Sequence, residues 1–317
     1  MLSWNERRLL TKISSWHYLD GWNHEKIAEK INVSRPVVSK LLQKARDTGI
    51  IDFYIDNSTE YSENLEAELK EVFCLKYAKV VSTKAINDEV LKANIMKAGI
   101  KYLMSRFPSV TSLGMGWGNT MSELVSKFPY HPLEALHIVS LTGGTGPDTK
   151  KIHANDLATQ LSKKLMCSHS YLYSPFIVDN VETKNELLSI PEISTTLNEG
   201  KNVDLAVVGM AAAGESPTLS QLGYLSDADA INLEELKAVG DINSCFFDMS
   251  GVEVESSFKS KNIGISLESL RQIPEVLSIS YGSHRVQSLY ICLKYQLVNS
   301  IITDELTAVS VLEMAKG

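Results

Sequence analysis

HEKIAEKINVSRPVVSKLLQKAR, residues 24–46, has the pattern of two short helices joined by a tight turn. In the first of these helices Ile27, Ala28 and Ile31 fall on one face, as the 3.6-residue period requires. Asn23 stands directly before that helix, where an asparagine side chain can accept a backbone N–H. This segment therefore predicts an amphipathic helix that begins at His24.

The second half of the stretch predicts a turn and another helix. Asn32-Val33 is the predicted turn, because asparagine tolerates the left-handed backbone conformation. Ser34 is the predicted N-cap, and Pro36 falls in the first helical turn, where its missing N–H costs nothing. The predicted buried face of this helix consists of Val37, Val38, Leu41, Leu42 and Ala45.

The outer face of this second helix is cationic, and no acid occurs between Ser34 and Arg46. Short polar residues at its start and cations along its length suit the major groove of DNA. The alternative is an ordinary helical hairpin with a solvated basic face, but capping, turn, periodicity and charge all favour a helix-turn-helix. The predicted DNA-contacting residues are Ser34, Arg35, Pro36, Ser39, Lys40, Lys44 and Arg46.

Charge separates this head from the rest of the chain. Residues 1–56 hold nine Lys/Arg and seven Asp/Glu, a balance of +2, within a chain of net charge −7. The remainder holds twenty-two and thirty-one, a balance of −9. A mildly basic head on an acidic body fits a DNA-binding unit whose larger part binds something other than phosphate backbone.

Cysteine usage and hydropathy indicate a soluble cytoplasmic protein. Cys74, Cys167, Cys245 and Cys292 are widely spaced, which suits buried reduced thiols better than disulfides or a zinc site. MLSWNERRLL at the N-terminus is too charged for a signal peptide, and no run of eighteen apolar residues occurs. We expect no metal and no cofactor.

The head contains a further helix and a tryptophan-rich core. Leu9, Leu10, Ile13, Trp16, His17 and Leu19 give an amphipathic pattern, and Trp4, Trp16 and Trp22 are predicted to fill the small core. IIDFYID (50–56) predicts a strand or wing, and NSTEYSEN (57–64) predicts a polar linker before a helix that starts near Leu65. The predicted domains are a DNA-binding head (1–56), a linker and oligomerisation helix (57–77) and an effector-binding domain (78–317).

Strand and helix patterns alternate from Ala78 onward. Helical patterns cover 85–107 and 155–166, and short β-branched runs lie between such segments. This alternation predicts an α/β fold with a doubly wound parallel sheet and helices on both faces. The predicted strands are AKVVS (78–82), SVTSLGMG (109–116), LHIVSLTGG (136–144), VDLAVVGM (203–210), VLSISYG (276–282) and NSIITD (299–304).

Glycine-rich turns follow several of these strands, where open α/β sheets bind ligands. In LGMGWGNTMSEL (113–124) a strand runs through Gly116 and Gly118 into a helix that begins at Asn119-Thr120, a natural cradle for phosphate or hydroxyls. This is neither a Walker motif nor a dinucleotide fingerprint, and alone it could be a tight turn without a ligand.

Three further loops are expected at the same sheet edge. LTGGTGP (141–147) and VGMAAAGE (208–215) each follow a strand, although the alanines of the second could serve packing alone. GDINSCFFDMSG (240–251) places Asp241 before a predicted hairpin with a turn near Gly251. Four converging loops favour a polar pocket.

The chain resembles the SorC family of bacterial sugar-responsive transcriptional regulators, of the broad DeoR/SorC type, over nearly its whole length. The resemblance rests on EKIAEKINVSRPVVSKLLQKARDTGIIDFYI in the head and on LGMGWGNT, SLTGGTG, DLAVVGM, GDINSCFFDMSG, ISLESLRQIPEVLSI and IITDELTAVSVL in the body. It implies a winged-type helix-turn-helix fused to a domain similar to sugar-phosphate isomerases and deaminases. It also implies tetramers built as dimers of dimers, and a sugar or sugar phosphate that changes operator affinity.

The resemblance also implies the effector site. The implied residues are Gly116, Gly118, Asn119 and Thr120 in the cradle, Gly143 and Gly144 alongside, Asp241 on ligand hydroxyls, and Ser283 and Arg285 in the turn YGSHR. Many family members have a lysine in that turn where Arg285 stands here. Arginine can hold a phosphate bidentately, with a geometry that differs from the point charge of lysine; the alternative is a surface cation at a helix start.

Two other functions remain open at this point. One is a sugar-phosphate isomerase or deaminase with an appended head, in which Asp241, Asp248 or His284 would act as acid or base. No nucleophile–base pair is evident in the sequence, and similarity of fold does not transfer activity. The other is a constitutive DNA-binding protein with an inert body. We expect a regulator rather than an enzyme, with double-stranded operator DNA and a small sugar as partners.

Overall fold

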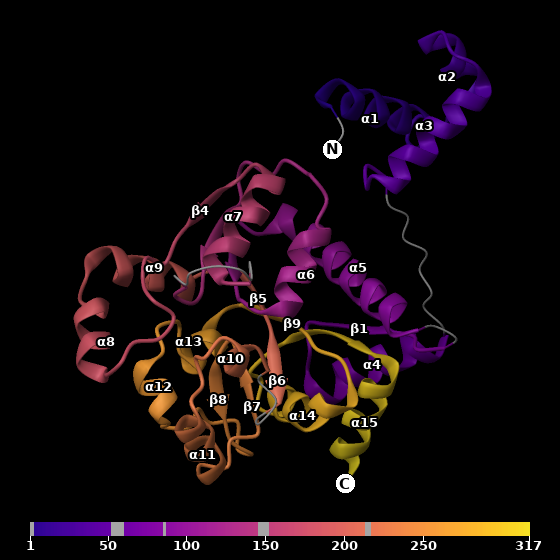
Figure 1. The fold of residues 1–317 in the computed structure, drawn as a ribbon. Helices are drawn as coiled ribbons and strands as arrows, with labels where there is room; N and C mark the ends of the chain where they lie inside the picture. The colour runs from indigo at the N-terminus through magenta and orange to yellow at the C-terminus, as the bar shows by residue number, and fades with distance from the viewer. Residues whose placement is uncertain (1–2, 52–59, 85–86, 145–151, 213–216) are drawn as a thin grey trace. The chain divides into compact units, whose positions relative to one another are not determined.

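A computed structural model describes residues 3–51, 60–84, 87–144, 152–212 and 217–317. The chain divides into two compact units, a head (1–56) and a body (57–317) (Figure 1). The strand or wing predicted over 50–56 falls largely outside the described residues. No helix in the described ranges is long and apolar enough to cross a membrane.

The described part of the head contains three helices and confirms the predicted turn. Asn23 Oδ1 accepts a hydrogen bond from the N–H of Lys26 (2.9 Å) and so caps the second helix. Asn32 ends that helix in the predicted left-handed conformation, with φ +54°. Ser34 occupies the N-cap position of the third helix, but its side chain makes no capping hydrogen bond. The helices are α1 (Trp4–Tyr18), α2 (His24–Ile31) and α3 (Arg35–Asp47).

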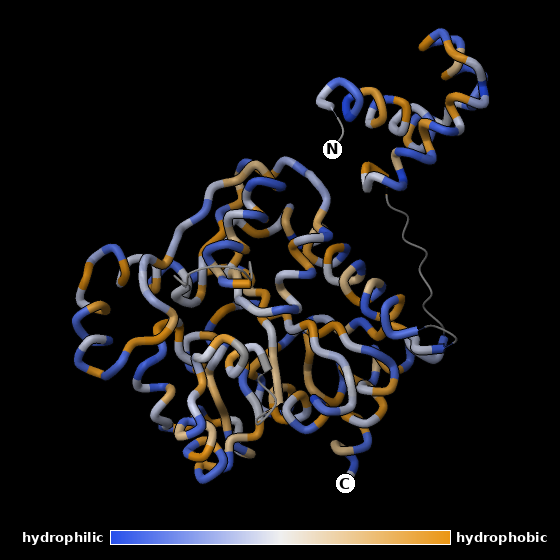
Figure 2. Tube along the Cα trace, in the orientation of Figure 1, coloured by the Kyte–Doolittle hydropathy of each residue, from blue (hydrophilic) through white to orange (hydrophobic). Residues whose placement is uncertain are grey.

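The apolar faces of these helices form the core of the head. In Figure 2 the helices alternate between apolar and polar residues, as amphipathic helices do. Trp16 and Trp22 pack on this core with their rings stacked 5.0 Å apart. The buried side chains are Leu10, Ile13, Ile27, Ala28, Val38, Leu42 and Ala45.

Four apolar positions predicted for the head core are exposed instead, and one of them is Leu9, at 38%. Val37 is 40% exposed, because it lies about 100° around the helix from buried Val38. Trp4 is 72% exposed in the first turn of α1, and Leu19 is 80% exposed where α1 has already ended.

The body is built on a parallel sheet of seven strands in the order β1-β10-β9-β5-β2-β3-β4. All six predicted strands are present, and the parallel pairing confirms the predicted sheet. The strands are β1 (Tyr77–Val81), β2 (Ser112–Met115), β3 (His137–Ser140), β4 (Ser168–Ser170), β5 (Leu205–Val208), β9 (Glu275–Ile279) and β10 (Ser300–Asp304). The sequence Ser-His-Ser gave no apolar signal for β4, which is an edge strand.

Helices cover both faces of this sheet, as a doubly wound fold requires. One face packs against α5 (Asp88–Arg106), α6 (Asn119–Lys127) and α7 (Ala154–Leu165). The other packs against α4 (Glu60–Phe73), α9 (Pro191–Lys201), α13 (Leu267–Gln272), α14 (Val286–Lys294) and α15 (Glu305–Lys316). The prediction of a polar linker up to residue 64 is wrong, since α4 begins at Glu60. Glu60 and Glu63 suit the positive amino end of a helix.

A smaller antiparallel sheet stands beside the main one. Strands β6 (Met210–Ala212), β7 (Gly240–Ile242) and β8 (Cys245–Phe247) pair in that order, and β7 and β8 form a hairpin that was not predicted. The predicted turn near Gly251 follows β8, where Phe247 bridges Glu253. Trp117, Phe176, Phe246 and Phe258 share the local core. The remaining elements are α8 (Val181–Leu188), α10 (Pro217–Gln221), α11 (Asp227–Glu235), α12 (Ser257–Lys261) and the 3-10 turns η1 (Phe107–Ser109) and η2 (Ser283–Arg285).

The four cysteines are free thiols, but the prediction that they are buried holds only in part. Cys245 and Cys292 are buried, whereas Cys167 is half-buried and Cys74 is exposed. Burial raises the pKa of the Cys245 thiol well above its ordinary value, which keeps it protonated. The thiols of the interior are therefore packing groups.

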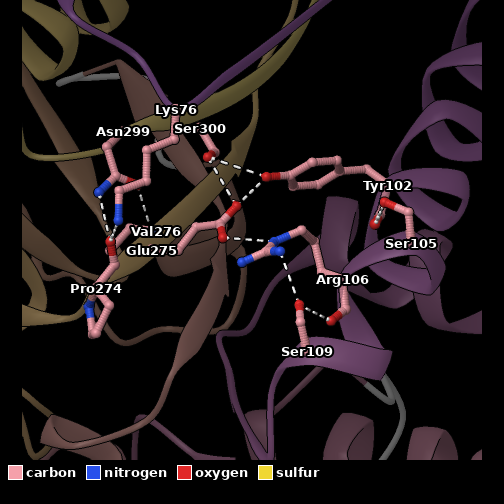
Figure 3. Close-up of polar contacts among 10 residues, drawn as sticks. All are labelled: Lys76, Tyr102, Ser105, Arg106, Ser109, Pro274, Glu275, Val276, Asn299 and Ser300. Atoms are coloured by element: carbon pink, nitrogen blue, oxygen red, sulfur yellow. Dashed lines mark hydrogen bonds and ion pairs between the residues drawn. The ribbon is translucent and has the colours of Figure 1, made fainter.

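A buried carboxylate fastens α5 to the amino end of the sheet (Figure 3). Glu275, the first residue of β9, is 3% exposed. It accepts hydrogen bonds from the Tyr102 hydroxyl, from Ser300 Oγ (3.0 Å) and from Arg106 Nε (2.9 Å). Burial, and then the hydrogen bond to Glu275, raise the pKa of Tyr102. The cluster supplies one charge-assisted hydrogen bond and two hydroxyl donors for this buried carboxylate.

Candidate functional site

The seven residues predicted to contact DNA are all exposed in the head. Ser34, Arg35, Pro36, Ser39, Lys40, Lys44 and Arg46 all lie at solvent-exposed positions of α3 or its N-cap. Val38, Leu42 and Ala45 are buried on the opposite side and attach α3 to the other two helices. The helix therefore presents a polar, mainly cationic surface to solvent, as a groove-binding helix must.

Two of these cations are paired with acids of the other head helices. Arg35 Nη1 lies 3.3 Å from Glu25 Oε1 of α2, and Lys44 contacts Glu6 of α1. The hydrogen bond from Lys44 lowers the pKa of Glu6. Exposed ion pairs of this kind are weak, because water screens both charges.

The order of the main sheet reverses between β2 and β5. From β2 the chain continues to β3 and β4 on one side, whereas β5, β9 and β10 follow on the other side. In open α/β sheets the crevice outside the carboxyl ends of the strands at such a switch point is the usual ligand site.

A pocket of about 110 Å³ lies at this switch point. Its walls come from the residues after β2, from those after β5, from α10, from the β7–β8 hairpin and from η2. The lining residues are Trp117, Gly118, Asn119, Thr120, Gly209, Met210, Ala211, Thr218, Leu219, Asp241, Asn243 and Arg285. Segments far apart in sequence thus converge on one concave, mixed polar and apolar site.

Five of the nine predicted effector residues line this pocket: Gly118, Asn119, Thr120, Asp241 and Arg285. Asn119 Nδ2 donates to Thr218 Oγ1 at 3.0 Å, which links α6 to α10 across the rim. Gly118 has φ +105°, a conformation available to glycine almost alone, and its N–H donates to Ile152 O. The N–H of Gly118 therefore already has an acceptor. The N–H groups of the first turn of α6, which follow it in the chain, are the ones that a ligand could use.

The other four predicted residues are not among the lining residues, and their contact with a ligand stays a prediction. Gly116 lies against β5 and the Asn243 side chain, where a Cβ would be 3.0 Å from Val207 O and 3.2 Å from Asn243 Oδ1. Gly143 has a packing role, since a Cβ there would lie 2.2 Å from Pro175 O. Gly144 packs on the ring of His153, and Ser283 is exposed in η2.

Sequence reasoning missed Trp117, Thr218 and Asn243. Trp117 is 8% exposed, stacks against His153 and donates from Nε1 to Ser244 Oγ at 2.7 Å. Its position between two glycines was a signal that could have marked it. Thr218 gave no local signal, because a distant segment brings it to the pocket. Asn243 lies in the loop 240–251 that was expected at the pocket, but only Asp241 of that loop was predicted to contact the ligand.

The groups suggested for acid–base chemistry have other surroundings. Asp248 accepts from the N–H groups of Ser250 and Val252 and so shapes the turn after β8. His284 is exposed in η2, and Asp241 Oδ2 accepts from the N–H of Ser244 (3.2 Å). Within the described ranges no group of three or more His, Cys, Asp or Glu side chains could hold a metal ion.

Comparisons with known proteins agree with this architecture. Residues 58–313 match the family model described as "Putative sugar-binding domain". The deoxyribonucleoside regulator of Bacillus subtilis (strain 168) is 25% identical over 303 residues, which are 96% of each chain.

Two solved structures are similar to the chain. The full-length sorbitol operon regulator SorC from Klebsiella pneumoniae is 25% identical, with a TM-score of 0.77 over 96% of this chain and 98% of that one. A DeoR family transcriptional regulator from Listeria monocytogenes is 33% identical, with a TM-score of 0.75 over 79% of this chain and 99% of that one.

Proposed function

The chain belongs to the SorC family of transcriptional regulators with a sugar-binding domain, and from this premise we propose that it reads operator DNA through α3 and senses a sugar or sugar phosphate in the switch-point pocket. Its relatives are regulators rather than enzymes. The observation that carries the proposal is the pocket itself, where loops from both sheets meet at the position that the fold favours for ligands.

In this proposal two heads of an oligomer place α3 in successive major grooves of an operator with two-fold character. Ser34, Arg35, Ser39 and Lys40 contact base edges or the adjacent backbone, and Lys44 and Arg46 contact phosphates. We place the protein in the cytoplasm and expect a tetramer built as a dimer of dimers. Its operator controls genes for carbohydrate use.

The pocket offers three kinds of group to a carbohydrate. Asp241 and Asn119 supply polar atoms for hydroxyl groups, the amino end of α6 supplies backbone N–H groups, and Arg285 supplies a cation. Arg285 also lies over the Tyr281 ring, with its Cζ 5.8 Å from the ring centroid. This set suits a polyol, with or without a phosphate.

The test is a thermal-shift screen of the full chain against free and phosphorylated pentoses and hexoses. A ligand at one hundred times its Kd stabilises the folded state by about 2.7 kcal/mol. The sugar that raises Tm should also change the affinity of the chain for a DNA fragment that it has selected from a random library. If no sugar in the screen changes either Tm or DNA affinity, the proposed function is wrong.

A further inference from the structure

Two consecutive non-glycine residues with left-handed backbones form the turn between β7 and β8. Asn243 has φ +51° and Ser244 has φ +69°. Two-residue hairpin turns that need positive φ at both positions favour Asn-Gly, because serine pays a steric penalty there. Strained backbone of this kind is concentrated at functional sites, so the side chains of the turn need an explanation.

The hydroxyl of Ser244 explains why glycine is absent from the second position. Ser244 Oγ accepts a hydrogen bond from Trp117 Nε1 at 2.7 Å, and both residues are buried. Trp117 lines the pocket. The serine therefore fixes one wall of the ligand site, which a glycine could not do.

Asn243 presents an unpartnered amide to the same pocket. Its side chain is 3% exposed, and neither Nδ2 nor Oδ1 has a hydrogen-bond partner among the described residues. Its backbone N–H is anchored on Gly209 O (3.2 Å), and the absence of a side chain at Gly116 leaves room for Oδ1. A buried amide without partners is costly and uncommon in native proteins.

We propose that Asn243 is a specificity-determining residue that reads an uncharged hydroxyl group of the ligand. An amide both donates and accepts, which matches a hydroxyl group, and the neighbouring Asp241 carboxylate disfavours an anion at this point. The part of the effector that reaches the β7–β8 turn is therefore an unphosphorylated polyol carbon. This inference rests on the proposed function, because it assigns a role within the sugar pocket.

The test compares the full-length wild type with the Asn243→Gly variant, which keeps the left-handed backbone and removes the amide. Lys237→Gly is the matched control, since Lys237 also has a positive φ (+55°) but is exposed and does not line the pocket. The probes are ribose 5-phosphate, glucose 6-phosphate, fructose 6-phosphate, their free sugars and the monodeoxy analogues of whichever binds, measured by calorimetry.

We expect Asn243→Gly to weaken binding of that sugar at least tenfold and Lys237→Gly to change it less than twofold. In wild type, loss of one particular hydroxyl should weaken binding about tenfold, and in the Asn243→Gly variant the same loss should have no further effect. If Asn243→Gly does not fold, Asn243→Ala, which also removes the amide, takes its place with the same expectation.

Two outcomes would overturn the inference and can be told apart. If wild type binds a sugar and the Asn243 variants bind it equally well, or keep the discrimination between the hydroxyl groups, the role of Asn243 is wrong and the proposed function stands. If wild type binds none of the probes, the proposed function fails and the inference fails with it.

Discussion

The cations of α3 differ in their contacts with acids of the other head helices. Arg35 and Lys44 lie beside Glu25 and Glu6 in the head, so replacing either cation would also break an ion pair within the head. Lys40 lies midway along the exposed face of the helix. Its removal should therefore report on groove binding more directly than the removal of either paired cation.

We expect Lys40→Ala to weaken binding to the selected DNA fragment by about 1–3 kcal/mol, roughly five- to more than one-hundred-fold. Fluorescence anisotropy at fixed salt measures the effect, because these affinities depend steeply on ionic strength. Lys201→Ala, an exposed lysine at the end of α9, is the control. Sugar affinity should not change, and equal DNA affinity for wild type and Lys40→Ala would contradict the placement of α3 in the groove.

Roles that depend on neighbouring residues in the sequence could be predicted. Roles that depend on contacts between distant segments could not. Asn23 and Asn32 act on neighbours a few residues away, so their capping and turn roles could be inferred from the sequence. Trp4 and Val37 were wrongly predicted to be buried, because an apolar residue can also lie on the side of a helix that faces solvent. Asn243 was missed although it lies two residues after Asp241, because nothing in the sequence states that its side chain is buried without a partner.

At the level of elements, the strands of the body interior were predictable from their β-branched runs, because both faces of a parallel sheet are buried. The edge strand β4 lacks that composition and was not found. The start of α4 was also missed, since Glu60 and Glu63 are polar yet stabilise the amino end of a helix.

The hydrogen bonds of Glu275, which join α5 to β9, give a prediction about the stability of the body. Glu275→Gln removes the charge that Arg106 and Tyr102 share and should lower the free energy of unfolding by about 2–3 kcal/mol. Chemical denaturation of wild type, of this variant and of the exposed control Glu234→Gln measures the effect. Sugar affinity should stay unchanged, because these hydrogen bonds lie at the opposite end of the sheet. A variant as stable as wild type would show that the buried carboxylate contributes nothing.

At the level of the whole molecule, regulation requires the pocket and the head to be linked energetically. A sugar can change operator affinity only if it binds the DNA-competent and DNA-incompetent arrangements with different strengths. A tenfold effect on operator affinity corresponds to about 1.4 kcal/mol of coupling. A regulator that senses a sugar therefore needs only a modest preference between arrangements.

We expect this coupling to be reciprocal. Saturating amounts of the selected DNA fragment should change the Kd of the sugar by the same factor by which the sugar changes the Kd of the DNA. Calorimetric titration of the sugar into the free chain and into its DNA complex gives the first factor, and DNA titrations with and without the sugar give the second. A DNA of scrambled sequence is the control. A sugar Kd that the selected DNA leaves unchanged would mean that the two sites are not coupled.

The Glu275 cluster has a consequence for how this protein can diverge. It fastens the scaffold at the amino ends of β9 and β10, whereas the pocket occupies the carboxyl ends of the strands. During evolution, residues at the pocket rim can therefore be replaced, and ligand specificity can change, without loss of the Glu275 cluster that stabilises the fold.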